Sequence, residues 1–188
     1  MVDMGKMAKK FLQKEDGNIL LIFAGSMVLI AFFIGICLDV SMIYVKRNSM
    51  QNILQIIREE RFTYQDTIRY SDNPALTTYH IAYSAAAENG FDGIVTVYFH
   101  EEDPEPNYRS YQVRILLTDE CPFYFGRIFG LDTVPLNVSL DGGESYGEGS
   151  ADVIWHSPLP VSNYNGAYTG IIGDMQVVYD GTDLPSDW

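Results

Sequence analysis

The sequence is poor in the residues that build most catalytic and metal sites. It has 2 cysteines and 3 histidines among 188 residues, and none of them has the spacing of a zinc or redox motif. It also lacks a GxSxG or HExxH motif, a phosphate-binding loop and a dinucleotide-binding fingerprint. These absences argue against an enzyme, and we expect no metal and no cofactor.

Positive charge is scarce as well. The formal net charge is -13, and no lysine or arginine follows Arg127. Phosphate binding needs a basic surface, so this balance argues against a nucleic-acid partner.

The most informative absence lies near the N-terminus, where residues 19–38 contain neither a charge nor a proline. As a helix this run covers roughly 30 Å, the thickness of the hydrocarbon core of a bilayer. A core helix of a soluble protein would normally show a polar face, which this run lacks. The sequence therefore predicts one transmembrane helix over residues 18–38, with membrane lipid around it. Cys37 lies inside this span and Cys121 outside it, so we expect no disulfide between them.

The charges around the span predict its orientation. Four lysines precede it, whereas Lys46 and Arg47 are the basic residues that follow it closely. This excess favours an N-terminus on the inside. The apolar run is longer than that of a signal peptide, and no small-x-small cleavage site follows it. We therefore expect a single-pass protein in which residues 1–17 form a cytoplasmic lead-in and residues 39–188 are extracytoplasmic.

The helical pattern continues beyond the span. No glycine or proline interrupts residues 39–62, so we expect one helix over residues 19–62 with a length of about 66 Å. Its outer part carries an apolar stripe at the spacing typical of packed helices. Either the chain's own downstream domain or the equivalent helix of another subunit would cover this stripe, and the sequence does not separate the two. The stripe consists of Ile43, Met50, Leu54 and Ile57.

Small residues in the span are candidates for helix packing. Ala31 and Gly35 form a small-xxx-small pair, and Ala24 lies one heptad before Ala31. Such residues let helices approach closely in lipid. We expect Asp39, which follows the last apolar residue, to be solvated at the membrane interface. Pairing with a neighbouring chain is the alternative. The full set of predicted packing and assembly residues is Ala24, Ala31, Gly35, Asp39, Ile43, Met50, Leu54 and Ile57.

The rest of the chain predicts an α+β fold. A polar, turn-rich segment over residues 63–73 precedes a second helix, which completes a helical region over residues 39–90. Residues 91–188 are β-rich, and we expect an antiparallel sheet that packs on the helices. The elements expected after residue 74 are a helix over 75–89, a hairpin of strands 94–100 and 111–117, an aromatic turn or short helix over 121–130 that ends at Gly130, a strand over 133–140, a loop over 141–150, and strands over 151–156 and 171–179, the last bent at Gly173.

Residues 15–52 resemble the N-terminal segment of the TadE/TadG-like proteins of bacterial tight-adherence (Flp-type) pilus systems. In that family a Gly-Asn pair opens an apolar span that ends in Val-Asp or Leu-Asp, followed by a tyrosine, a basic pair and Leu-Gln-Asn or similar. The later order of an alanine-rich helix, a hairpin and an aromatic segment is also similar, so the resemblance covers about residues 15 to 140. The matching residues here are Gly17, Asn18, Leu38, Asp39, Tyr44, Lys46, Arg47, Gln51 and Asn52.

The resemblance implies a pilin-like, non-enzymatic component of a tight-adherence pilus or a related secretion system. It places the chain in the bacterial cytoplasmic membrane or in a surface pilus, with other pilin-like or pilus-assembly proteins packed on the span and the stalk. The fifth residue after Gly17 is Ile22 rather than the glutamate of processed pilins, so we do not expect cleavage by a prepilin peptidase. Two alternatives stay open: a single-pass anchor that displays an extracytoplasmic ligand-binding or sensory domain, and an anchored hydrolase.

Overall fold

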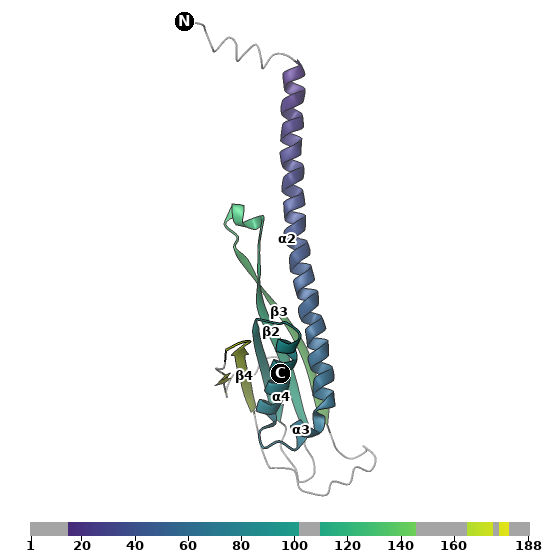
Figure 1. Ribbon diagram of the computed structural model, residues 1–188, viewed down its shortest axis with the longest axis vertical. Helices are drawn as coiled ribbons and strands as arrows, with labels where there is room; N and C mark the ends of the chain where they lie inside the picture. The colour runs from purple at the N-terminus through teal and green to yellow at the C-terminus, as the bar shows by residue number, and fades with distance from the viewer. Residues whose placement is uncertain (1–14, 102–109, 146–164, 175–176, 181–188) are drawn as a thin grey trace. The chain divides into compact units, whose positions relative to one another are not determined.

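The computed structural model describes residues 15–101, 110–145, 165–174 and 177–180. Its first element is a single helix, α2 (Glu15–Thr63), which continues through Asp39 without a break (Figure 1). Among the described helices, α2 is the one that is long and apolar enough to cross a membrane, and its apolar part is almost entirely exposed. The predicted continuous helix is therefore confirmed.

The described elements after α2 form an α+β arrangement, as predicted. The sheet has five strands in the order β3-β2-β1-β4-β5. The central strand β1 pairs antiparallel with β2 and with β4, and β4 pairs antiparallel with β5. These elements are α3 (Gln65–Arg69), α4 (Pro74–Glu88), β1 (Ile94–Glu101), β2 (Ser110–Pro122), the 3-10 helix η1 (Gly126–Phe129), β3 (Thr133–Ser145), β4 (Asn165–Ile171) and β5 (Val177–Asp180).

The chain divides into two compact units. The first unit combines Met1–Tyr44 with Pro122–Asp132, the segment that connects β2 to β3. The second unit combines Val45–Cys121 with the chain from Thr133 onward. Each unit is internally packed.

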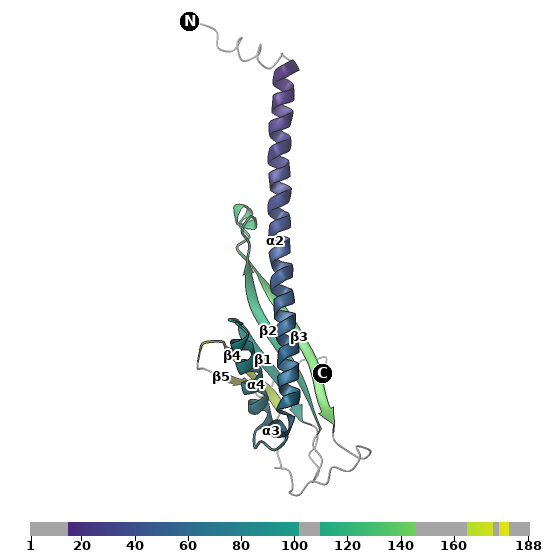
Figure 2. The same cartoon turned by 45° about the vertical axis from the view of Figure 1, so that its right-hand side comes forward.

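The hydrophobic core of the second unit is built on one face of β1 and β2. The strand register places each buried apolar residue of β1 opposite a buried residue of β2, as the two-residue period of a strand requires. Helix α4 packs on β1 and β4, and Figures 1 and 2 show it beside these strands. The paired core residues are Val95 and Leu117, Val97 and Ile115, and Phe99 and Val113.

The C-terminal part of α2 contributes to the same core. Met50, Leu54 and Ile57 are all buried within the second unit. The chain's own domain therefore covers this part of the apolar stripe, which answers for these three residues the question that the sequence left open.

Helix α4 confirms the second predicted helix to within one residue. Asn73 precedes it, and its side-chain oxygen accepts a hydrogen bond from the Leu76 N–H at 2.9 Å. Pro74 occupies the first helical position, where a missing N–H costs nothing. The Asn73 amide also donates to the Tyr168 hydroxyl at 3.0 Å, which joins the start of α4 to β4.

The predicted strand over residues 171–179 is wrong. Strand β4 ends at Ile171, and β5 begins at Val177 and runs antiparallel to it. Between them Gly173 has a φ angle of 90°, a left-handed conformation that glycine adopts without steric cost. The glycine that we expected to bend one strand therefore forms part of a turn between two.

Two further predictions differ from the structure in extent. The expected loop over residues 141–150 begins too early, because β3 extends to Ser145. The turn-rich segment over residues 63–73 contains the short helix α3. The predicted strand over residues 151–156 lies outside the described residues.

Two adjacent isoleucines of α2 test the burial of the stripe. Ile57 is 0% exposed, whereas its neighbour Ile56 is 37% exposed. Replacing Ile57 with alanine removes buried methyl and methylene groups and leaves a cavity, so we expect a loss of about 2–5 kcal/mol in unfolding free energy. The control Ile56→Ala should cost less than about 1 kcal/mol. Denaturant unfolding in detergent micelles measures both, and equal losses would contradict the packing described above.

Candidate functional site

In the first unit, the side chain of Asp39 is bound by backbone N–H groups of the segment that connects β2 to β3. Oδ1 accepts from Tyr124 at 2.9 Å, and Oδ2 accepts from Gly126 at 2.8 Å. The N–H of Phe125 lies 3.2 and 3.1 Å from the two oxygens. Asp39 is 5% exposed. The prediction that it is solvated is therefore wrong, because these N–H groups take the place of water.

Two opposing effects act on the pKa of Asp39. Burial raises the pKa, because it disfavours the charged carboxylate. The three backbone hydrogen bonds lower it, and their combined effect leaves the pKa of Asp39 below its ordinary value. The carboxylate is therefore ionised at neutral pH. The stability that it contributes is present above the pKa of the unfolded chain and is lost as the pH falls through the lower folded pKa.

Local geometry explains why this segment presents its amides to a carboxylate. The first N–H groups of a helix lack intrahelical partners, and the three donors lie at the start of η1. Gly130 ends η1 in the left-handed conformation, with a φ angle of 78°, as the sequence predicted. The Phe123 N–H donates to the Asp132 carbonyl at 2.9 Å, and the Leu131 N–H donates to the Gly126 carbonyl at 3.1 Å. We call Pro122–Asp132 the capped loop.

Aromatic side chains of the capped loop pack on α2 within the first unit. Gly35, one helical turn before Asp39, is buried, and a β-carbon at this position would collide with the ring of Phe125. The ring of Phe32 lies edge-on to Phe125 and Phe129, with centroid distances of 5.9 and 5.5 Å. Gly35 was predicted to allow the close approach of a neighbouring helix. It instead allows the close approach of the Phe125 ring of the same chain.

The space between α2 and the capped loop is a pocket of about 290 Å³. Its lining is almost entirely apolar, and Asp39 is its one acidic residue. Such a pocket suits an apolar group better than a polar ligand. The lining residues are Phe32, Ile36, Asp39, Val40, Phe123, Phe125, Gly126, Phe129 and Leu131.

The structure brings together two of the eight predicted packing residues, Gly35 and Asp39, at the capped loop. Ala24 and Ala31 are exposed on the apolar part of α2, and Ile43 is half-buried. The other three lie in the core of the second unit: Met50, Leu54 and Ile57.

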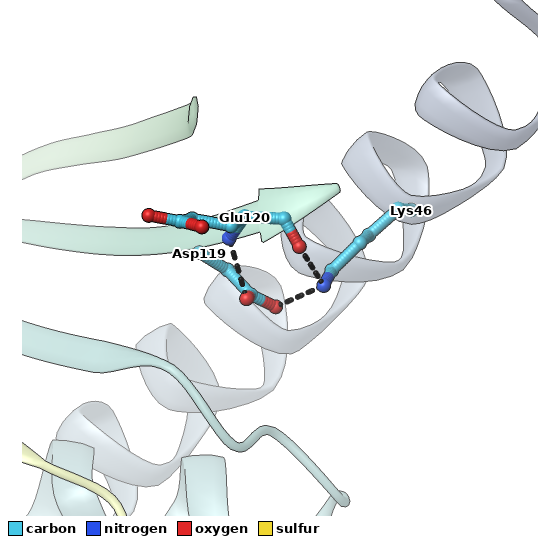
Figure 3. A network of polar contacts seen from close by, with 3 residues as sticks. All are labelled: Lys46, Asp119 and Glu120. Carbon is cyan, nitrogen blue, oxygen red and sulfur yellow. Dashed lines mark hydrogen bonds and ion pairs between the residues drawn. The ribbon is translucent and has the colours of Figure 1, made fainter. Parts of the chain in front are cut away.

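Lys46 makes a contact in the second unit that the sequence did not predict (Figure 3). Its Nζ lies 2.7 Å from Oδ2 of Asp119 and donates to the carbonyl of Glu120 at 2.6 Å. The other oxygen of Asp119 accepts from the Glu120 N–H. From the sequence, the expected role of Lys46 is in membrane orientation. Its spacing of seven residues from Asp39 is the signal that places both on one face of the helix.

The contact of Phe125 and Phe129 with Phe32 of α2 is a further difference from the sequence prediction, which gives an aromatic turn or short helix without a partner. One available signal was composition, because Arg127 is the single charged residue between Pro122 and Leu131. A connection between two strands is usually more polar than this.

Within the described part of the chain, no group of three or more His, Cys, Asp or Glu side chains could hold a metal ion. Comparisons of the whole chain with protein-family models, curated proteins and solved structures found no match.

Removing the Asp39 carboxylate should release the capped loop. In Asp39→Ala, the amides of Tyr124, Phe125 and Gly126 lose their acceptor, so we expect their hydrogen exchange to accelerate by roughly an order of magnitude. Exchange measured by mass spectrometry in detergent micelles tests this. The control Asp92→Ala, which changes an exposed aspartate of the second unit, should leave these amides protected. Unchanged exchange in Asp39→Ala would refute the capping role.

Two glycines of α2 provide a matched pair for the aromatic contact. Gly35→Ala places a methyl group where the Phe125 ring lies, whereas a methyl group at Gly25 meets nothing within 4 Å. We expect Gly35→Ala to displace the ring and speed exchange in the capped loop, and Gly25→Ala to have no such effect. The same exchange measurement compares them. Equal protection in both variants would show that the ring does not rest on Gly35.

Proposed function

We propose that this chain is a non-enzymatic, membrane-anchored, pilin-like component of a bacterial tight-adherence (Flp-type) pilus or a related secretion system. The apolar part of α2 would cross the cytoplasmic membrane once, with the N-terminus inside. The β-rich domain would lie outside the cytoplasm or in a surface pilus. The observation that carries the proposal is α2 itself, an unbroken helix with an exposed apolar N-terminal part and a C-terminal part packed in an α+β domain.

The exposed part of α2 needs an apolar environment. Large apolar side chains from Ile19 to Leu38 are mostly more than half exposed, and water is a poor solvent for so continuous a surface. On the scale of membrane insertion, the Ile, Leu, Phe and Val residues of this run favour lipid by roughly 4–8 kcal/mol. Lipid and other apolar helices are the two environments that satisfy them.

The arrangement along α2 favours contacts with other pilin-like helices. Ala24 and Ala31 are exposed, so their small side chains are accessible to a neighbouring helix. Gly35 is covered by Phe125 and is not accessible in this way. The resemblance to the TadE/TadG-like proteins around Gly17, Leu38 and Asp39 supports a pilus apparatus as the setting for such contacts.

Cysteine crosslinking in the native cells tests the proposal. In a Cys37→Ser background, Ala31→Cys should form adducts with pilin-like or pilus-assembly proteins after treatment with a bifunctional thiol reagent. The control Ser84→Cys, at an exposed position of α4, should give several-fold fewer adducts. We expect the Ala31 adducts to disappear in cells from which the genes of a tight-adherence pilus apparatus are deleted.

A chain that stays monomeric at both positions would count against the pilus function. That result would favour the single-pass anchor with a ligand-binding or sensory domain, which does not need partners along its span.

A further inference from the structure

We propose that the capped loop is a second membrane contact, whose outer face inserts into the lipid beside the point where α2 leaves the bilayer. This inference rests on the membrane anchoring by α2 that is part of the proposed function, and it does not depend on a pilus.

The depth of the contact on α2 carries the inference. Phe32 lies six residues before Leu38, the last residue of the apolar run, which corresponds to about 9 Å along a helix. Within the first unit, Phe125 and Phe129 contact the ring of Phe32. If the apolar run of α2 crosses the bilayer, the aromatic side chains of the loop therefore lie at the depth of the hydrocarbon core.

The outer face of the capped loop has the composition of a lipid-facing surface. Four large side chains are between 56% and 70% exposed. Tyr124 combines an apolar ring with a polar hydroxyl, as side chains at membrane interfaces commonly do. Arg127 is exposed, and its long side chain can extend its charge to the lipid headgroups. The four exposed residues are Tyr124, Ile128, Phe129 and Leu131.

Most backbone N–H groups of the loop have acceptors other than water. Irregular segments are excluded from lipid chiefly because their N–H and C=O groups lack partners there. In this loop, three N–H groups donate to the Asp39 carboxylate and four others donate to carbonyl groups of the loop. Pro122 has no N–H to satisfy. The donors of the second group belong to Phe123, Ile128, Gly130 and Leu131.

Lipid fits this surface better than a second protein because the surface is continuous with the span. Ile36 and Val40 of α2 are exposed beside the pocket that Leu131 of the loop also lines. The apolar surface thus passes from helix to loop within one unit, and a bilayer around α2 would surround both.

Fluorescence quenching by labelled lipids tests the insertion. The full-length Cys37→Ser chain carrying Ile128→Cys is labelled with a nitrobenzoxadiazole (NBD) dye and reconstituted into phosphatidylcholine vesicles, with or without nitroxide-labelled phosphatidylcholine. Leu29→Cys in the span and Ser84→Cys on α4 are the deep and aqueous controls. A second loop label at Leu131→Cys repeats the test, and the Cys37→Ser chain alone gives the background from the buried Cys121.

We expect the loop labels to emit at shorter wavelength than the Ser84 label and to be quenched several-fold more strongly by nitroxide lipid. Quenching equal to that at Ser84, with strong quenching at Leu29, would overturn the insertion and leave the anchoring intact. A blue-shifted loop label that lipid does not quench would show a second protein copy on this face and would also overturn it. Absence of quenching at Leu29 would overturn the insertion together with the anchoring.

Discussion

A segment that packs on an apolar helix must find partners for its backbone N–H groups without water. In this chain the carboxylate of Asp39 accepts from three successive amides and remains ionised while buried. The aromatic contact on Gly35 and Phe32 depends on this arrangement. Without the carboxylate, three N–H donors at the start of η1 would be unsatisfied, because the apolar surface of α2 offers no acceptors.

The chemistry of α2 changes along one face while the spacing stays constant. At positions seven residues apart, this face is aromatic, then acidic, then basic, then aliphatic. Each side chain contacts a group of matching chemistry in its own unit. Phe32 and Asp39 contact the capped loop, Lys46 contacts the end of β2, and Ile53 is buried in the core. An apolar stripe was therefore only part of the pattern.

Much of the fold could be predicted because it rests on local rules. The length of α2 follows from the absence of breakers between residues 39 and 62, and the β1–β2 hairpin follows from its alternation. The burial and hydrogen bonding of Asp39 could not be predicted, because its partners lie 85 to 87 residues away in the chain. The turn at Gly173 was missed because glycine within an apolar run is compatible with either a bend or a reversal.

The same long separation sets an order of events during synthesis. Chains fold from the N-terminus as they are made, so under the proposed anchoring α2 enters the membrane well before residues 124–126 exist. Asp39 must then be hydrated at the bilayer surface for as long as the ribosome takes to reach the loop. The carboxylate becomes an acceptor for the amides once they arrive.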